Sequence, residues 1–187
     1  MSTLAKAAIF ASGSGSNMQA IIDDAQLDCD IVLLVCDQPG AKVIQRAEDH
    51  GLESFVCSPK AMESKEAYEQ AIIKELQKKE VEWIFLAGYM RLIGPNLLQA
   101  FKGKIINIHP SLLPSFKGLH AIEQAMEAGV KVTGVTIHYV DEGMDTGPII
   151  AQEAVTIDSG DTIEDVKEKI HQVEHRLYPQ TIQQLIQ

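Results

Sequence analysis

Short apolar runs of strand length alternate along the chain with stretches of helical periodicity, and this alternation constrains the fold more than any other feature. Runs that are apolar at consecutive positions are typical of strands covered on both faces, as in a parallel sheet. Strands are predicted at Ala7–Ala11, Ile31–Cys36, Ser54–Cys57, Trp83–Ala87 and Lys104–His109. Helices are predicted at Asn17–Asp24, Lys42–His50, Lys65–Lys79 and Ile122–Ala128. The pattern therefore predicts an α/β fold with a doubly wound, mostly parallel, Rossmann-like sheet and helices on both faces.

The pattern changes in the C-terminal half. The segment Thr133–Val140 alternates apolar and polar residues, which predicts a half-exposed strand, and Pro148–Val155 predicts another strand. We expect these two strands to pair antiparallel around the turn 141–147. A last helix is predicted from Ile163 to Leu185, capped by Asp161 or Thr162, and Pro179 is expected to kink or interrupt it. No linker divides the chain, so we expect one domain over residues 1–187.

Composition excludes several classes of function. The net charge of −10 disfavours binding to nucleic acid, where contacts from Lys and Arg to phosphates dominate the affinity. The three cysteines are odd in number and form no C-x-x-C pair, so we expect neither a disulfide framework nor a zinc ribbon. We expect no metal site, on the premise that no two histidines have a metal-ligand spacing such as H-x-x-x-H. The sequence carries no apolar stretch long enough to cross a membrane. We expect a cytoplasmic protein that contacts no membrane.

A turn rich in glycine and serine, Ser12–Asn17, joins the first strand to the first helix. Glycines let a backbone approach a ligand closely, and the start of a helix offers unpaired N–H groups and the positive end of a dipole. The turn is therefore expected to cradle a phosphate without the help of any Lys or Arg.

Two alternatives for this turn stay open. It is a flexible connection with no ligand, or it is the start of a dinucleotide-binding fingerprint with Asp37 as the acid that holds a ribose. Against the second alternative, Met18 occupies the third glycine position of that fingerprint, where close packing of helix on strand requires Gly or Ala. The sequence thus favours a phosphate of mononucleotide size.

The segment that ends the fifth predicted strand carries the most informative polar residues. Asn107 and His109 are two positions apart, so their side chains point to the same side of the strand. Pro110 cannot donate a hydrogen bond to a sheet, so the strand is expected to end at its carboxyl edge, where α/β sheets bind ligands. An amide donor beside an imidazole suits a reaction that develops an oxyanion. The alternative is that both side chains are only satisfied core residues.

The acidic loop 141–148 is also open to two interpretations. It is a solvated hairpin turn, or one of its carboxylates faces His109. An opposite charge about 4 Å away favours the imidazolium form by roughly 4 kcal/mol at an intermediate dielectric, before desolvation is subtracted. His120 and His138 are weaker candidates, as residues that line a ligand or as ordinary helix-start and strand residues.

These motifs are similar to those of the folate-dependent formyltransferases, and the chain resembles the glycinamide ribonucleotide transformylase family within that group. The resemblance runs nearly from end to end and rests on the segments Ser12–Asn17, Leu86–Leu92, Asn107–Pro114, Gly134–Asp141, Asp145–Pro148 and Glu174–Pro179. The Asn-x-His-Pro-Ser-Leu-Leu-Pro motif is shared by several formyltransferases, and the Gly/Ser-Asn loop narrows the substrate.

The resemblance implies a role for each matching residue. The catalytic trio is Asn107, His109 and Asp145. The ribonucleotide phosphate is held by Gly15, Ser16 and Asn17, and the ribose hydroxyls by Glu174. The folate is bound by Met90, Arg91, Leu92, Ile93, Asn107, Val140 and Asp141, with Lys65 near the glutamate tail. The family's pattern further implies a nucleotide-binding half at about 1–103 and a folate and catalytic half at about 104–187.

The resemblance also implies the reaction. The formyl group of 10-formyltetrahydrofolate, the co-substrate, is transferred to the amine of glycinamide ribonucleotide in purine biosynthesis, with no metal and with a homodimer left open. Three alternatives remain: a methionyl-tRNA formyltransferase, a formyltetrahydrofolate deformylase and a nucleotide-binding module without catalysis. The short acidic chain disfavours a tRNA partner.

Overall fold

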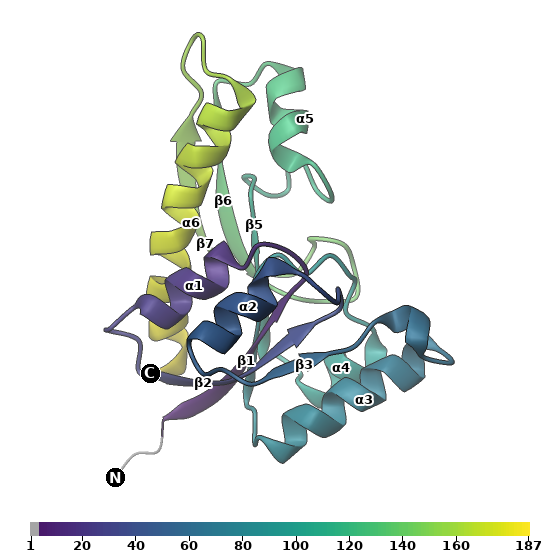
Figure 1. Cartoon of the computed structure of the whole chain (residues 1–187). Helices are drawn as coiled ribbons and strands as arrows, with labels where there is room; N and C mark the ends of the chain where they lie inside the picture. Colours follow the sequence, from purple (N-terminus) through teal and green to yellow (C-terminus); the bar gives the residue numbers. More distant parts are fainter. Residues whose placement is uncertain (1–3) are drawn as a thin grey trace.

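The computed structural model describes residues 4–187. Their strands form one seven-stranded sheet (Figure 1). The strands lie in the order β3-β2-β1-β4-β5-β6-β7. Their bounds are β1 Ala5–Ala11, β2 Cys29–Cys36, β3 Ser54–Val56, β4 Trp83–Leu86, β5 Ile105–His109, β6 Val132–Tyr139 and β7 Ile149–Thr156. The five strands predicted in the first half and the two in the second half are all confirmed, with bounds shifted by one or two residues.

The sheet is mixed in the way that the sequence predicts. Strands β1 to β5 pair parallel, whereas β6 pairs antiparallel with both β5 and β7. Strand order reverses between β1 and β4, because β2 and β3 lie on one side of β1 and all later strands on the other. Such a reversal opens a crevice at the carboxyl ends of the strands. The candidate site described below lies there.

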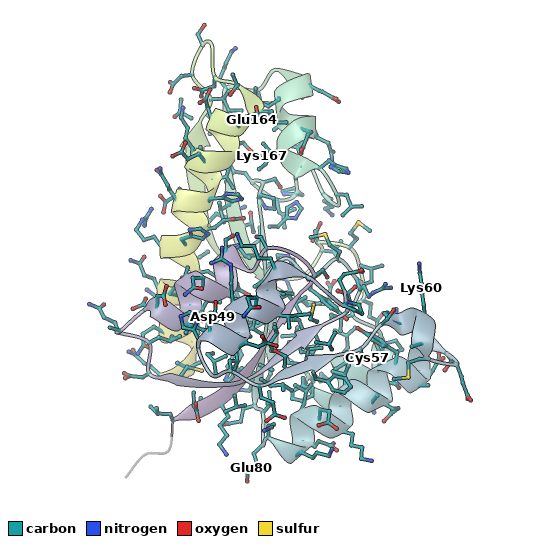
Figure 2. All side chains as sticks on the ribbon, viewed as in Figure 1. Asp49, Cys57, Lys60, Glu80, Glu164 and Lys167 are labelled. Carbon is teal, nitrogen blue, oxygen red and sulfur yellow. The ribbon has the colours of Figure 1, made fainter. Side chains whose placement is uncertain are left out.

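Helices cover both faces of the sheet, as predicted. On one face lie α1 Ser16–Asp23, α2 Lys42–Asp49, α5 Ala121–Ala128 and the long α6 Ile163–Ile186. On the other face lie α3 Lys65–Lys78 and α4 Pro95–Ala100, with the short helix η1 Pro59–Ala61 beside them. Charged side chains such as Lys60 and Glu80 extend outward from the ribbon (Figure 2).

Strand β1 shows why a continuously apolar run suits this position. Alternate residues point to opposite faces, so Ile9 packs with the α1/α6 layer and Phe10 with the α3/α4 layer, and both are fully buried. Burying a side chain of this size contributes roughly 1.5–3 kcal/mol. The first strand therefore anchors both layers and carries the glycine-rich turn at its end.

Three expectations about local structure need correction. Strand β6 is not half-exposed, since Thr136 and His138 are as buried as their apolar neighbours. The reason is that β5 and β7 flank this strand and that helices or loops cover both of its faces. Helix α4 was not anticipated, although Gly94 and Pro95 provide a start signal in retrospect, with proline in the first turn.

The third correction concerns Pro179, which does not interrupt α6. The helix runs unbroken for 24 residues from a capping box between Thr162 and Asp165. Just before the proline, the hydroxyl of the fully buried Tyr178 donates to the carbonyl of Leu86 at 2.9 Å. This tertiary anchor joins α6 to the centre of the sheet, so packing outweighs the local cost of the proline.

Candidate active site

A cavity of about 240 Å³ lies at the carboxyl ends of β4 and β5, beside the reversal of strand order. Its polar wall includes Asn107, His138 and Asp145, and much of the remaining wall is apolar. The cavity thus combines a few convergent polar groups with an apolar surround, which is the usual composition of a small-molecule site.

Asn107, near the end of β5, is oriented by a histidine from the neighbouring strand. Its amide Nδ2 lies 3.3 Å from Nε2 of His138, and Nδ1 of His138 lies 2.8 Å from the carbonyl oxygen of Tyr139. A carbonyl can only accept, so Nδ1 carries the proton and Nε2 accepts from the Asn107 amide. One N–H of Asn107 is therefore held in place while the amide borders the cavity.

Burial lowers the pKa of His138, and this effect exceeds the opposing effects of the Tyr139 carbonyl and of Asp145; the nearby His109 adds a smaller lowering. The imidazole of His138 is 2% exposed. A neutral His138 is the form that this hydrogen-bond pattern requires, so electrostatics and geometry agree.

His109, two residues beyond Asn107, has an acceptor at each ring nitrogen. Its Nδ1 lies 3.5 Å from a carboxylate oxygen of Asp145, and its Nε2 lies 2.8 Å from the carbonyl oxygen of Phe116. The same carboxylate accepts the backbone N–H of Gly118 at 2.7 Å. The doubly protonated imidazolium form fits this pair of acceptors, and Asp145 is fixed by the backbone of the loop that follows β5.

The structure thus brings together the three residues of the predicted trio and adds His138. His109 stands behind the cavity wall, because Phe116 takes its Nε2–H. The acidic loop is not merely a solvated turn, since the side chain of Asp145 is only 12% exposed. The other acids of the loop lie nearer the surface, where Asp141 accepts bonds from Gly143 and Thr146 within its own loop.

The glycine-rich turn leads into α1 as predicted. Gly15 adopts a left-handed backbone with φ of 77°, and a Cβ added there would lie 2.6 Å from a methyl of Val43. Only glycine therefore fits this close approach of the turn to α2. Ser16 is the first residue of α1, and the amide of Asn17 donates to Glu174 on α6 at 3.3 Å.

Glu174 is a buried acid at the same place. It is 5% exposed, and burial raises its pKa to about 7 from an ordinary value of 4.5 despite the opposing hydrogen bond from Asn17. The Oδ1 atom of Asn17 is buried and has no partner among residues 4–187. An unpaired acceptor beside a partly protonated acid is suited to hydroxyl groups of a ligand, which both donate and accept.

The phosphate cradle expected at this turn stays a prediction, and the structure places beside the turn a cation that the expectation did not include. Arg46 of α2 donates through Nε to the carbonyl of Ser14 at 2.8 Å and through Nη1 to Gln19 at 3.3 Å. A guanidinium therefore lies against the turn and adds positive charge to it. Asp37, the acid of the dinucleotide alternative, is already bound by Ser12 and Arg91, which disfavours a role in holding a ribose.

The residues predicted to bind a folate line the cavity or the groove that continues from it. Met90, Arg91, Leu92, Ile93, Val140 and Asp141 border the cavity, and Lys65 borders the adjoining groove together with Met90 to Ile93. Large apolar side chains at its rim are exposed, among them Met90 at 61%, Leu92 at 53% and Leu119 at 64%. Clustered exposed apolar groups indicate an interaction surface at the rim of the cavity.

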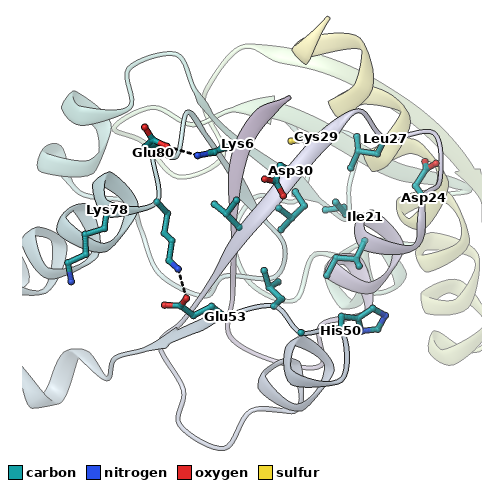
Figure 3. A pocket seen from close by; sticks show the side chains of 16 residues that line it. Lys6, Ile21, Asp24, Leu27, Cys29, Asp30, His50, Glu53, Lys78 and Glu80 are labelled. Carbon is teal, nitrogen blue, oxygen red and sulfur yellow. Dashed lines mark hydrogen bonds and ion pairs between the residues drawn. The ribbon is translucent and has the colours of Figure 1, made fainter. Parts of the chain in front are cut away.

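Other parts of the described chain lack such convergence. A hollow of about 660 Å³ lies at the opposite ends of β1 and β2, where Lys6 pairs with Glu80 and Lys79 with Glu53 (Figure 3). Its cations are thus neutralised by neighbouring acids. Within residues 4–187, no helix has the length and apolar character to span a bilayer.

The premise that no two histidines have H-x-x-x-H spacing is wrong, because His171 and His175 on α6 form such a pair. Their rings stack with centroids 5.9 Å apart and planes 9° apart. Over the described residues, no group of three His, Cys, Asp or Glu side chains gathers as a metal site.

Sequence reasoning missed several contacts at the site. His138 was only one of two weak candidates, and Arg46 and the backbone of Phe116 and Gly118 were not considered. The partners of His138 and Arg46 lie 31 and 32 residues away along the chain. Local pattern therefore carries no signal for these contacts.

Comparison with known proteins agrees with this geometry. A model of the family described as "Formyl transferase" matches residues 5–182. The chain is 59% identical over 184 residues to the phosphoribosylglycinamide formyltransferase of Bacillus subtilis, covering 97% of this chain and 94% of the relative. It is 40% identical to the trifunctional purine biosynthetic protein adenosine-3 of Drosophila melanogaster, of which it spans only 14%.

Solved structures give the same result. The glycinamide ribonucleotide transformylase 1 of Geobacillus kaustophilus superposes with a TM-score of 0.96 at 58% identity, covering 98% of this chain and all of the other. The similarity therefore extends over the whole sheet and both helical layers.

Proposed function

The chain belongs to the formyl transferase family, and on that premise we propose that it transfers a formyl group from 10-formyltetrahydrofolate to the amine of glycinamide ribonucleotide, in purine biosynthesis. The observation that carries the proposal is the convergence of Asn107, His109 and Asp145 beside an apolar cavity next to the glycine-rich turn. The high identity to a phosphoribosylglycinamide formyltransferase supports the choice of acceptor.

When bound, 10-formyltetrahydrofolate supplies an activated formyl group. The task of the protein is then to stabilise the negative charge that develops on the formyl oxygen as the amine adds to the carbon. Asn107 is suited to this task because His138 holds one of its N–H groups and fixes the direction of the other. A donor held in advance costs little reorganisation in the transition state.

His109 supplies the second donor and the route for a proton. Asp145 faces Nδ1 and favours the imidazolium form, while the Gly118 N–H holds the carboxylate in place. Because Nε2–H is bonded to the Phe116 carbonyl, His109 reaches the formyl oxygen by exchanging that acceptor for the substrate. Protons lost by the attacking amine reach the departing folate nitrogen through His109 or water.

The two substrates occupy opposite sides of this centre. Gly15, Ser16 and Asn17 hold the phosphate with backbone N–H groups, and Arg46 adds charge at the same turn. Glu174 holds the ribose hydroxyls. Met90 to Ile93, Val140 and Asp141 enclose the folate ring system, with Lys65 beside its acidic tail.

We further propose that the protein acts in the cytoplasm on small molecules and not on nucleic acid. Its net charge of −10 disfavours a tRNA acceptor. The acid at position 174 and the glycine-rich turn would have no role in hydrolysis of the formyl folate by water alone. These observations favour a nucleotide acceptor over the two related activities.

One experiment separates these acceptors. Purified protein is mixed with 10-formyltetrahydrofolate and offered glycinamide ribonucleotide, charged initiator tRNA or water alone, and release of tetrahydrofolate is followed by absorbance. We expect rapid release only with glycinamide ribonucleotide. Equal rates with water alone would show a deformylase, and binding of the nucleotide without any release would show a module that does not catalyse.

A further inference from the structure

Asp37 is a buried carboxylate at the carboxyl end of β2 that the reaction described above does not use. It is 1% exposed, whereas most acids of the chain are at the surface. One of its oxygens accepts from the hydroxyl of Ser12, and the other accepts from Nε of Arg91 at 2.7 Å and from the side-chain amide of Gln38 at 3.2 Å. A buried charge is tolerated only when it is paired and hydrogen-bonded, and Asp37 meets both conditions.

These bonds join three loops that leave the sheet on both sides of the strand reversal. Asp37 follows β2, Ser12 follows β1, and Arg91 belongs to the segment that follows β4. The hydroxyl of Ser12 also accepts the backbone N–H of Met90 at 2.9 Å, and the Ser12 N–H donates to the carbonyl of Gly88 at 3.0 Å. The wall at 88–91 is thus tied to the carboxylate at two points.

The bond through Nε has a consequence for the guanidinium. A guanidinium is a planar fork, so fixing Nε fixes the direction of both terminal nitrogens. Arg91 borders both the cavity and the adjoining groove, and its side chain is 37% exposed. The buried partner therefore sets the pose of a cation whose terminal groups remain open to a ligand.

From these contacts we propose that Asp37 is a positioning residue of the formyl donor site: it orients the Arg91 guanidinium directly and the Met90 N–H through the hydroxyl of Ser12. The inference rests on the proposed function, since it assigns the 88–91 wall to the folate. Asp37 itself touches no substrate. Its effect is expected on binding of the donor and not on binding of the nucleotide, which Gly15 to Asn17 hold on the other side.

The central variant is Asp37→Asn, which keeps the shape of the side chain but removes the charge and one acceptor. An amide can accept from Arg91 or from Ser12 but not from both. We expect KM for 10-formyltetrahydrofolate to rise about tenfold, equivalent to about 1.4 kcal/mol, while KM for glycinamide ribonucleotide changes less than about twofold. Asp30→Asn removes an exposed acid from β2, the strand that Asp37 follows, and is the matched control, with both KM values unchanged.

A double-mutant cycle tests whether Asp37 acts through Arg91. In an Arg91→Lys background, where the fork is absent, Asp37→Asn is expected to change the donor KM by less than about twofold. If Asp37→Asn does not fold, Ser12→Ala still cuts the tie to Met90, and we expect it to raise the donor KM by about threefold with the nucleotide KM unchanged.

The outcomes separate this inference from the proposed function. Binding of tetrahydrofolate and of glycinamide ribonucleotide is also measured by calorimetry on the wild-type protein, and failure of wild type to bind folate would contradict the proposed function. If wild type binds and turns over normally, the inference on Asp37 is overturned by equal changes in both KM values, by no change in either, or by an effect of Asp37→Asn that is undiminished in Arg91→Lys.

Discussion

Glu174, which is proposed to bind the substrate, is expected to lower the free energy of unfolding of the protein above neutral pH. Its pKa is about 7 in the folded chain against 4.5 as the ordinary value, because burial penalises the charged form. As pH rises from about 4.5 to 7, the unfolded chain loses this proton first, so the folded state binds more protons and its stability falls. At about 1.4 kcal/mol for each pKa unit, the cost above pH 7 is roughly 3 kcal/mol.

Replacing this acid by an amide should remove the cost. In Glu174→Gln the new N–H₂ group can donate to the Oδ1 of Asn17, which is buried without a partner in the described chain, while the amide oxygen still accepts from Asn17. We expect equal stability of variant and wild type near pH 4.5, and a more stable variant at pH 8 by up to roughly 3 kcal/mol.

Urea denaturation at several pH values measures this difference. With a slope of about 2 kcal/mol per molar urea, the midpoint of Glu174→Gln should exceed that of wild type by about 1–2 M at pH 8. KM for glycinamide ribonucleotide should rise at least about tenfold, because charge-assisted bonds to the ribose are lost. Glu168→Gln, an exposed acid on the same helix, is the control. The same pH dependence in Glu174→Gln and wild type would refute the reasoning.

Three further predictions follow from single contacts. Asp145→Asn should lower kcat by about a hundredfold or more. The melting temperature should change little, because an amide oxygen can still accept the Gly118 N–H. Near-normal turnover would contradict the role of the carboxylate. Gly15→Ala should destabilise by about 2 kcal/mol, through its left-handed φ and contact with Val43, and weaken nucleotide binding in calorimetry. Tyr178→Phe should cost about 1 kcal/mol in chemical denaturation with kcat unchanged, since only the bonds from its buried hydroxyl are lost; an unchanged midpoint would argue against that anchor.

Much of the fold was predictable because it depends on local pattern. Continuous apolar runs predicted the positions of the parallel strands. The two-residue spacing of Asn107 and His109 predicted that both side chains lie on one side of β5, and the strand ends before Pro110 as expected. Thr162, one of the two caps expected for the last helix, is the residue that caps α6. These features need only a few adjacent residues and the geometry of a strand or a helix.

The rest of the site depends on contacts that no local pattern encodes. Arg91 and its partner Asp37 are 54 residues apart, and Asp37 became adjacent to the 88–91 wall only because the sheet places β1 and β4 side by side. The burial of His138 likewise follows from the position of β6 between β5 and β7. Polar alternation along β6 suggested solvent on one face, whereas that face borders the site at His138 and is bonded to the loop after β5 at Thr136.

In the proposed reaction the two histidines at the centre take opposite protonation states, and their contacts differ. His138 donates through Nδ1 to the Tyr139 carbonyl, so a second proton on Nε2 would displace the Asn107 amide from its acceptor and place a cation 3.8 Å from Asp145. Such a cation would compete with His109 for the one carboxylate that faces both rings. Burial of His138 opposes that proton. In the proposed reaction, a neutral His138 is therefore a condition both for the orientation of Asn107 and for the charge on His109.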